Sequence, residues 1–565
     1  MDKIIKVKGE KMKKHIYALL FVSLAATLYA QEALKSTEEE YYDFLYLLGK
    51  VERPTLNYRT LSDNEWNLTE GTEHLWQNNN LGKTFNLYSQ NIENKNWFLN
   101  GLNLGLKAKI YGPQWFNSYN TASPYGQNDG ALWQGKGYNT ALTGGLRLEG
   151  YGFELTFKPQ ITFSQNLEFT LLPSAYDSEY AYFWGYGNNK GIDAPQRFGN
   201  TPYWQYDWGD SEIRWTWHSF TTGFGTQSIW LGPVELNPLL HSNNAPTYPK
   251  FDIGIRKTEL IVPNTNISLG TIEGRMWLGY LTESDYFDND DTNNHNQITT
   301  FSISYEPPYL SGLVFGINKV CLSKWDSDFW KYLNPFYDDN YVGSDASKGE
   351  DQKMSVTVDY FNKKANLELY TELGLDDYLQ GGWIIGLLRY PMDSLMWTFG
   401  LKQMHSYTDK IKGELVLEVS NMELPSNKIA AKASYSYNMH YQISQGYTNR
   451  GQVIGTALAN GGNSQYLKYK LYYPKGCSEL FFQRTNPDNT YSYLNLSNEN
   501  QTYKSNFYVG ISNTHYVLQD LYLNFGFVYN LIINPYYWDT SEDGSVIQTG
   551  YINNFHFSLG AKYTF

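Results

Sequence analysis

The feature that most constrains the fold of this 565-residue chain is a repeated alternation of apolar and polar residues. From Leu102 to Ile110 every second residue is apolar, and the residues between are polar or glycine. Successive side chains of a β-strand point to opposite faces, so the pattern predicts strands with one apolar and one polar face. The alternation recurs in segments 146–157, 354–360, 367–373, 414–419, 466–472 and 521–530. Stretches rich in Asn, Asp and Gly, such as 286–296 and 338–351, predict long loops between them.

The last segment of the chain alternates in the same way and carries aromatic residues on one face. Its apolar face contains Phe555, Phe557, Leu559, Ala561, Tyr563 and Phe565. Such a strand resembles the terminal strand of bacterial outer-membrane proteins. It can pair with the first strand and so remove both edges of the sheet. An ordinary terminal strand of a soluble sheet is the alternative.

The composition fits a large barrel better than a soluble enzyme. Aromatic residues make up 17% of the chain and charged residues only 18%, against about a quarter charged in average soluble proteins. In a transmembrane barrel the aromatic side chains form girdles at the two membrane interfaces. A secreted all-β repeat protein or propeller is the alternative. The net charge of -13 argues against a nucleic-acid partner, which needs a basic face.

The first 30 residues have the pattern of a secretory signal peptide. Met12-Lys13-Lys14-His15 precedes an apolar stretch at 16–28, and Ala30 offers a cleavage site. No later run of about 18 apolar residues predicts a membrane-spanning helix. An exported chain without one is either soluble or a closed barrel, and the alternating strands favour a barrel in the cell outer membrane.

The segment after the signal peptide predicts a helix. Ser36 and Glu39 form a capping box, and apolar residues follow at helical spacing until Gly49. We therefore expect residues 31–95 to form a small periplasmic helical region, packed under or into the barrel mouth. Residues 96–565 then form the transmembrane antiparallel β-barrel, with roughly 16–20 strands.

The sequence contains no recognisable catalytic constellation. His218, His241 and His405 are the candidates for a general base of a hydrolase, and none has a known catalytic context. His241 is followed by Ser242, but adjacent side chains on a strand point to opposite faces. We therefore expect a protein that is not an enzyme.

No metal or cofactor site is predicted either. Cys321 and Cys477 fit no metal pattern, and either a disulfide or two free thiols is compatible with the sequence. Gly461-Gly462 lacks the Lys and Ser/Thr of a phosphate loop. A loop with the carboxylates to hold Ca²⁺, but without EF-hand spacing, contains Asp285, Asp288, Asp290 and Asp291.

The abundant Tyr, Trp and Asn residues suit sugar recognition. Aromatic faces stack on the C–H faces of sugar rings, and planar amides and charged groups pair with neighbouring hydroxyls. Interface girdles and polar loops need the same residue types, so composition leaves both interpretations open.

Local motifs go further. The Leu-Trp-Gln-Gly-Lys-Gly-Tyr-Asn-Thr segment at 132–140 and Trp230-Leu231-Gly232-Pro233 resemble the capsule assembly Wzi family. The family segment often has two tryptophans before the glycine, whereas this chain has Trp230-Leu231. Further segments that resemble the family, in the same order, are 192–199, 240–246, 281–284, 446–455 and 462–465.

This resemblance implies an 18-stranded outer-membrane barrel with a small periplasmic helical bundle. It also implies a non-catalytic lectin that holds capsular or other surface polysaccharide on the cell. The expected partners are that polysaccharide and outer-membrane lipid, and a monomer is expected. The alternative is an outer-membrane channel, because a barrel of this size can hold an open lumen.

The carbohydrate-binding residues predicted from the matched segments are the polar residues and two tryptophans as stacking platforms. Structural roles compete at these positions: Arg197 can brace the barrel by pairing with a luminal carboxylate, and Gly451 suits a turn. The predicted set is Trp133, Arg197, Trp230, Asn243, Asn244, Arg450, Gln452, Asn463 and Gln465.

Overall fold

The structure is a computed structural model, and part of the chain lies outside the residues that it describes. It describes residues 29–31, 36–69, 71–90, 96–172, 174, 176, 178–183, 191–325, 350–376, 388, 395–423, 437–440, 442–458, 461–490, 492, 503–537 and 550–565. The predicted signal peptide lies outside them, apart from its last two residues, and so does nearly all of the predicted loop 338–351. No helix among the described residues is long and apolar enough to cross a membrane.

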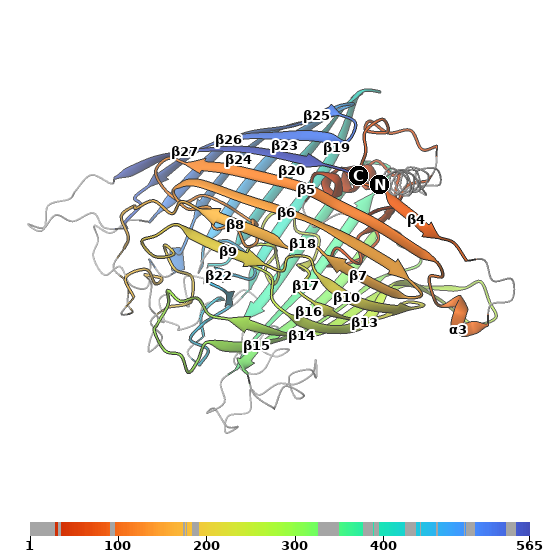
Figure 1. Ribbon diagram of the computed structural model, residues 1–565, viewed down its shortest axis with the longest axis horizontal. Helices are drawn as coiled ribbons and strands as arrows, with labels where there is room; N and C mark the ends of the chain where they lie inside the picture. The colour runs from red at the N-terminus through yellow and green to blue at the C-terminus, as the bar shows by residue number, and fades with distance from the viewer. Residues whose placement is uncertain are drawn as a thin grey trace, which may run out of the picture.

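An antiparallel sheet closes on itself to form a barrel (Figure 1). Its strands are β5 (Leu106–Asn120), β6 (Gly137–Gly150), β7 (Phe153–Phe157), β8 (Gln160–Ser164), β9 (Tyr203–Asp207), β10 (Glu212–Trp217), β11 (Phe220–Gly225), β13 (Lys250–Ile261), β14 (Ser268–Thr282), β15 (His295–Glu306), β16 (Leu313–Lys324), β17 (Glu350–Asn362), β18 (Leu367–Asp376), β19 (Met396–Thr408), β20 (Ile411–Asn421), β23 (Asn463–Tyr473), β24 (Gly476–Asn486), β25 (Ser505–Leu518), β26 (Leu521–Ile533) and β27 (Tyr551–Tyr563).

Closure comes from the pairing of β27 with β5. Strands β7 and β8 both pair with β6, so together they make one interrupted strand of the barrel. Strands β10 and β9 pair with β7 and β8, respectively, and make the next interrupted strand. Counted in this way, the described residues form a barrel of 18 strands, which confirms the predicted fold class.

The alternation in the sequence corresponds to the two faces of the barrel wall. On β27 the side chains of Phe555, Phe557 and Leu559 are 40%, 50% and 44% exposed on the outside. At the alternate positions, Asn554 and His556 are buried on the inside. The strand predicted to begin at Leu102 begins only at Leu106, because the residues before it follow the short helix α3 (Trp97–Asn100) in a turn. An apolar outer face is the surface that a barrel presents to lipid.

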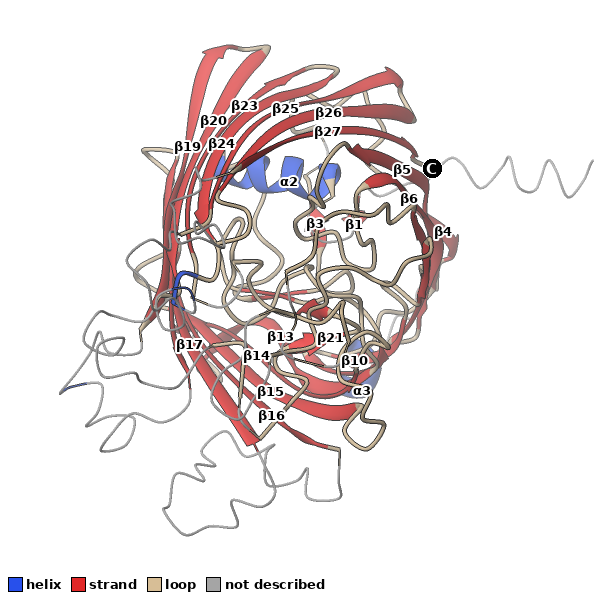
Figure 2. Cartoon of the chain, turned by 90° about the vertical axis from the view of Figure 1, so that its left-hand side faces the viewer, coloured by secondary structure: helices blue, strands red, loops and turns tan. Residues whose placement is uncertain are grey.

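The N-terminal part of the chain begins inside the barrel and ends at its wall. Helix α2 (Thr37–Leu47) runs across the lumen (Figure 2). The Glu39 N–H donates to Ser36 Oγ at 3.1 Å, and Gly49 ends the helical turn with a φ of 69°. This confirms the predicted helix and its Ser36 N-cap, while the Glu39 carboxylate, expected to complete a capping box, pairs with Arg59. Short strands follow: β2 (Tyr58–Arg59), β3 (Glu65–Asn67), which pairs with β1 (Tyr29–Gln31), and β4 (Thr84–Tyr88), which pairs with β5.

Luminal side chains hold this segment in place. The Glu273 carboxylate on β14 accepts three backbone N–H groups, from Leu56 at 3.1 Å, Asn57 at 2.7 Å and Tyr58 at 3.0 Å. Arg275, on the same strand, pairs with Asp63 at 2.5 Å. A carboxylate that satisfies several buried N–H groups is a strong anchor for a segment without its own secondary structure.

The loop between β11 and β13 also folds into the lumen. Glu418 on β20 accepts the N–H groups of Glu235 at 2.9 Å and Asn237 at 3.0 Å, and Glu372 on β18 accepts that of Leu239 at 2.7 Å. Apolar residues of the loop join luminal residues in a buried cluster that contains Ile229, Leu231, Leu239, Leu240, Tyr248, Trp277, Ile298 and Val320. The barrel thus has a hydrophobic core inside its lumen.

The two ends of the barrel differ. Helix α2 and strand β4 lie toward the end of the barrel at which the chain reaches Phe565 (Figure 1). We call this the terminal end. The longer connections, including residues 121–136 between β5 and β6, lie at the opposite end, which we call the loop end. Cys321 and Cys477 are buried and free, so they form no disulfide.

Candidate functional site

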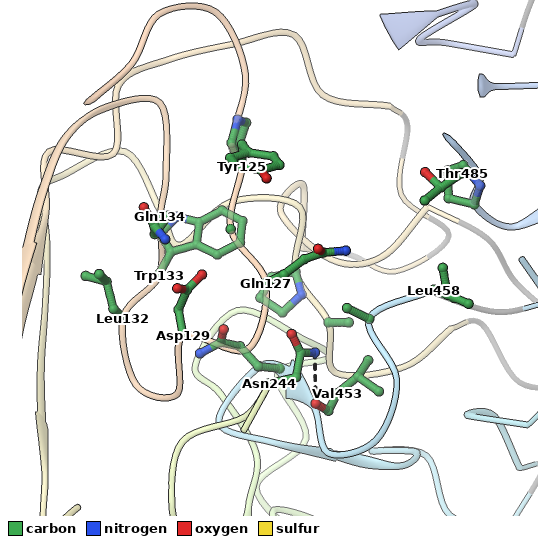
Figure 3. Close-up of a pocket in the computed structure, with 18 of the residues that line it drawn as sticks. Tyr125, Gln127, Asp129, Leu132, Trp133, Gln134, Asn244, Val453, Leu458 and Thr485 are labelled. Atoms are coloured by element: carbon green, nitrogen blue, oxygen red, sulfur yellow. Dashed lines mark hydrogen bonds between the residues drawn. The ribbon is translucent and has the colours of Figure 1, made fainter. Parts of the chain in front are cut away.

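A cavity of about 330 Å³ lies among the segments at the loop end (Figure 3). Its walls come from the β5–β6 loop, residues 192–195, Asn244, residues 451–453, and the facing ends of β24 and β25. The short strands β21 (Thr448–Asn449) and β22 (Gln452–Val453) form the hairpin that carries one wall. Residues far apart in the sequence therefore meet at a single site.

Aromatic rings form one part of the cavity lining. The Tyr125 ring lies 5.3 Å from the Tyr508 ring at 37°, and it also meets His556 edge-on at 5.0 Å. The Trp133 ring packs on Phe198 at 5.1 Å. Because neighbouring rings fix their orientation, Tyr125 and Trp133 are held in place before any ligand arrives.

Planar amides form another part. Asn244 Nδ2 donates to the Val453 carbonyl at 3.1 Å (Figure 3). Gln452 Nε2 donates to the Gly130 carbonyl, also at 3.1 Å. Each of these bonds occupies one of the two N–H groups of its amide, so each amide keeps one N–H donor and its oxygen acceptor for other partners. Gln134 is more tightly held, since its Oε1 accepts from Ser118 Oγ at 2.6 Å.

Asp129 is the charged side chain of the cavity lining within the described part of the chain. Burial raises the pKa of its carboxyl group to about 7, against the weaker opposing effect of hydrogen bonds from the Gln134 side chain and the Gln127 backbone. The carboxyl group therefore changes its charge near neutral pH.

Three of the predicted site residues line this cavity: Trp133, Asn244 and Gln452. Asn243 lies beside it, where its backbone carbonyl accepts the Gly130 N–H at 2.7 Å. Arg197 is buried behind the wall. Its guanidinium donates to the Asn166 carbonyl at 2.8 Å and to Asn200 Oδ1 at 3.0 Å.

Two more predicted residues have structural environments. Trp230, on β12 (Trp230–Leu231), is fully buried, and its indole N–H donates to the Val234 carbonyl at 3.0 Å. A ring with no exposed face offers no platform for a sugar, so Trp230 is not part of the site that we propose below. Arg450 sits in the β21–β22 turn with a φ of 48°, and its Nη1 donates to the Tyr206 carbonyl at 3.3 Å.

Asn463 and Gln465 lie on the outer face of the barrel wall. They share a face of β23 with Leu467, whose side chain is 38% exposed. Arg484 Nη1 donates to Gln465 Oε1 at 2.8 Å and to Asn463 Oδ1 at 3.2 Å. The cavity and this polar group are thus on different sides of the wall.

Sequence reasoning missed several lining residues. Tyr125, Gln127, Asp129 and Gln134 belong to the β5–β6 loop, and Tyr508 comes from the start of β25. Gln134 falls within the 132–140 motif, and the other three loop residues shortly precede it. Including the residues just before the motif would therefore have identified them as candidates. No local signal identified Tyr508, which reaches the cavity only through the barrel closure.

Of the three histidines considered as general bases, His241 has both ring nitrogens in structural contacts. His241 is buried, with Nδ1 3.0 Å from the Ile229 carbonyl and Nε2 2.7 Å from the Tyr248 hydroxyl. Burial lowers its pKa to about 3, so it is neutral at physiological pH. Within the described ranges no three His, Cys, Asp or Glu side chains are grouped so that they could hold a metal ion.

The fold and the cavity define a class: an 18-stranded barrel of the outer-membrane type, with helix α2 and the β11–β13 loop folded into its lumen and a cavity among its loops. No family model matches the sequence, and no curated protein does. A similar solved structure is Escherichia coli Wzi, described as an outer-membrane protein involved in group 1 capsule assembly and a carbohydrate-binding β-barrel. It is 11% identical with a TM-score of 0.52, over 80% of this chain and 85% of that one.

Two further structures are less similar. OccAB1 of Acinetobacter baumannii is 10% identical with a TM-score of 0.37, over 80% of this chain and 96% of its own. OccAB4 of the same organism is 8% identical with a TM-score of 0.38, over 82% and 98%. At such identities the likeness to Wzi establishes the fold alone.

Proposed function

We propose that this protein is an outer-membrane lectin that holds capsular or other surface polysaccharide on the cell without catalysing a reaction. The observation that carries the proposal is the cavity at the loop end, whose lining combines the Trp133 and Tyr125 rings with the side-chain amides of Asn244 and Gln452. The apolar outer face of the barrel supports the membrane location. The carbohydrate binding described for Wzi supports the ligand class.

The chemistry of the cavity suits a sugar. An aromatic ring contacts the C–H face of a pyranose, and planar amides bond to the hydroxyls at its rim. The volume of about 330 Å³ is at the lower end of ligand pockets, roughly enough for one or two sugar rings. The site therefore suits a chain end or a short segment of a polymer.

Binding to purified protein tests the proposal. Isothermal titration with oligosaccharides from the polysaccharide of the producing cell should show weaker binding for Trp133→Ala and Gln452→Ala, by roughly tenfold or about 1.4 kcal/mol each. Gln465→Ala is the matched control, because Gln465 lies on the outer face of the wall. The affinity of this variant for the oligosaccharide should equal that of the unmodified protein. Equal affinity for all three variants would contradict the proposed site.

A second test uses cells. Deleting the gene should release polysaccharide into the medium while synthesis continues. Unchanged cell-bound polysaccharide would refute the attachment function. The channel alternative is weakened by the α2 segment and the β11–β13 loop, which occupy the lumen.

A further inference from the structure

We infer that the cavity selects uncharged sugar units and discriminates against uronic acids and other anionic sugars. This inference rests on the proposed function and names the ligand class of the same cavity. It follows from the charge and the hydrogen-bonding character of the residues that form the walls.

The first argument is charge. None of the described residues that line the cavity is Lys, Arg or His, and Asp129 is the ionisable acid among them. A carboxylate that enters a partly dehydrated site loses its hydration and needs a cation or several N–H donors in return. Here it would instead meet a second carboxylate, which repels it whenever Asp129 is ionised.

The second argument is that nearby cations are engaged elsewhere. Arg197 donates to Asn166 and Asn200 behind the wall, and Arg450 donates to the Tyr206 carbonyl. Lys504 precedes β25, with its ammonium 5.9 Å from the Tyr537 ring centre and within the field of Asp488. None of the three cations lines the cavity.

The third argument is the balance of donors and acceptors. One N–H group of Asn244 and one of Gln452 are used on the Val453 and Gly130 carbonyls, which leaves each amide with its second N–H as a donor and its oxygen as an acceptor. Asp129 also accepts when it is ionised. Hydroxyl and acetamido groups both donate and accept, so they match a wall that holds donors and acceptors, whereas a carboxylate only accepts and can make no hydrogen bond with the Asp129 carboxylate or the amide oxygens.

Apolar side chains complete the match. Ile192, Ala194, Val453 and Leu458 line the cavity beside the aromatic rings. These groups contact C–H and methyl surfaces well, and they offer nothing to a charged substituent. The polar walls can therefore bond to the hydroxyl or acetamido groups of a neutral hexose or an N-acetylated hexosamine, and the apolar walls can contact its C–H and methyl groups.

The test uses oligosaccharide pairs that differ in one functional group. Hyaluronan, heparosan and alginate fragments are compared with their carboxyl-reduced forms, in which each uronate has become the neutral hexose. Fragments of the producing cell's polysaccharide are treated in the same way. Isothermal titration at pH 8, where Asp129 is ionised, should give at least tenfold tighter binding for the reduced member of each pair that binds.

Two variants locate the cause. Asp129→Asn should bring the affinities for reduced and native fragments closer together, because it removes the charge that repels the native carboxylate. Gln127→Arg supplies a cation and should reduce or reverse the difference between the two affinities. This variant still tests the inference if Asp129→Asn folds poorly. Native fragments that bind as tightly as their reduced forms would overturn this inference and leave the proposed function standing. Binding of neither form would overturn the proposed function and the inference with it.

Discussion

Asp129 shows how one residue can be shaped by its surroundings. It lies in the β5–β6 loop between Gln127 and Gln134, and burial raises the pKa of its carboxyl group from 3.8 to about 7. A buried acid with no paired cation is costly when ionised, and such acids are concentrated at binding sites. Stability is therefore given up at this position in the unbound protein.

The pH dependence of stability should reveal this cost. Because the folded pKa lies above the unfolded value, the folded state binds a proton that the unfolded state has lost between these values. The contribution of Asp129 is full below about pH 4 and is lost as the pH rises through about 7. Urea unfolding in detergent from pH 5 to 8 should show stability falling with pH, and Asp129→Asn should flatten the curve. Identical slopes for the two proteins would contradict this assignment.

At this scale the sequence predicted only part of the site. Trp133, Asn244 and Gln452 were predicted because they lie within local motifs. Trp230 and Gln465 lie within similar motifs, yet one is buried in the lumen and the other faces outward. Whether a side chain is buried, and which face of the wall it occupies, depends on strand register and on which loops fold inward. A short motif carries no information on either.

At the scale of elements, the strands and the inward-folding segments differ in how they are stabilised. The strands follow from the alternation of apolar and polar residues, and α2 follows from its capping box, so both were predictable. The β11–β13 loop has no such period. Its path depends on Glu418 and Glu372, which come from strands more than a hundred residues away in the sequence. Contacts of this kind cannot be read from local sequence.

The anchor at Glu273 gives a test at the same scale. Glu273→Ala leaves the N–H groups of residues 56–58 without their acceptor, at a cost of about 1–3 kcal/mol for each group that stays buried. Hydrogen exchange of these amides should accelerate strongly. Glu259→Ala is the matched control, since Glu259 is exposed on β13. Equal protection in both variants would show that this carboxylate is not the anchor.

At the scale of the whole molecule, the protein has two apolar surfaces with different partners. One is the outer face, which carries side chains such as Phe557 and Leu559, and the other is the core within the lumen. The first is the kind of surface that a transmembrane barrel presents to lipid, and the second packs against the folded chain itself. The closed sheet separates them, because successive residues of each strand contribute to opposite sides.

Charge placed on the outer face tests this arrangement. Phe557 lies near the middle of β27, so Phe557→Lys should destabilise the barrel in lipid vesicles by about 2–4 kcal/mol. Tyr551→Lys, at the loop end of the same strand, should cost about 0–1 kcal/mol. Equal costs at the two positions would indicate that the outer face does not sit across a bilayer.

The filled lumen predicts electrical behaviour as well. The α2 segment and the β11–β13 loop occupy the space through which ions would pass. Planar-bilayer recordings should therefore show no large, steady open steps. Steps of the size that general porins give would favour the channel alternative.

The way in which the cavity is built has a mechanical consequence. Its walls come from loops that continue into β5, β6, β24 and β25, and the Gln452–Gly130 hydrogen bond ties two of these walls together. If a polymer held there is pulled by flow, the load passes into several strands along their length. Many interstrand hydrogen bonds then resist at once, whereas peeling a single edge would break them in turn. If the protein is the polysaccharide tether proposed above, we expect a sugar under load to leave the cavity long before the barrel wall unfolds.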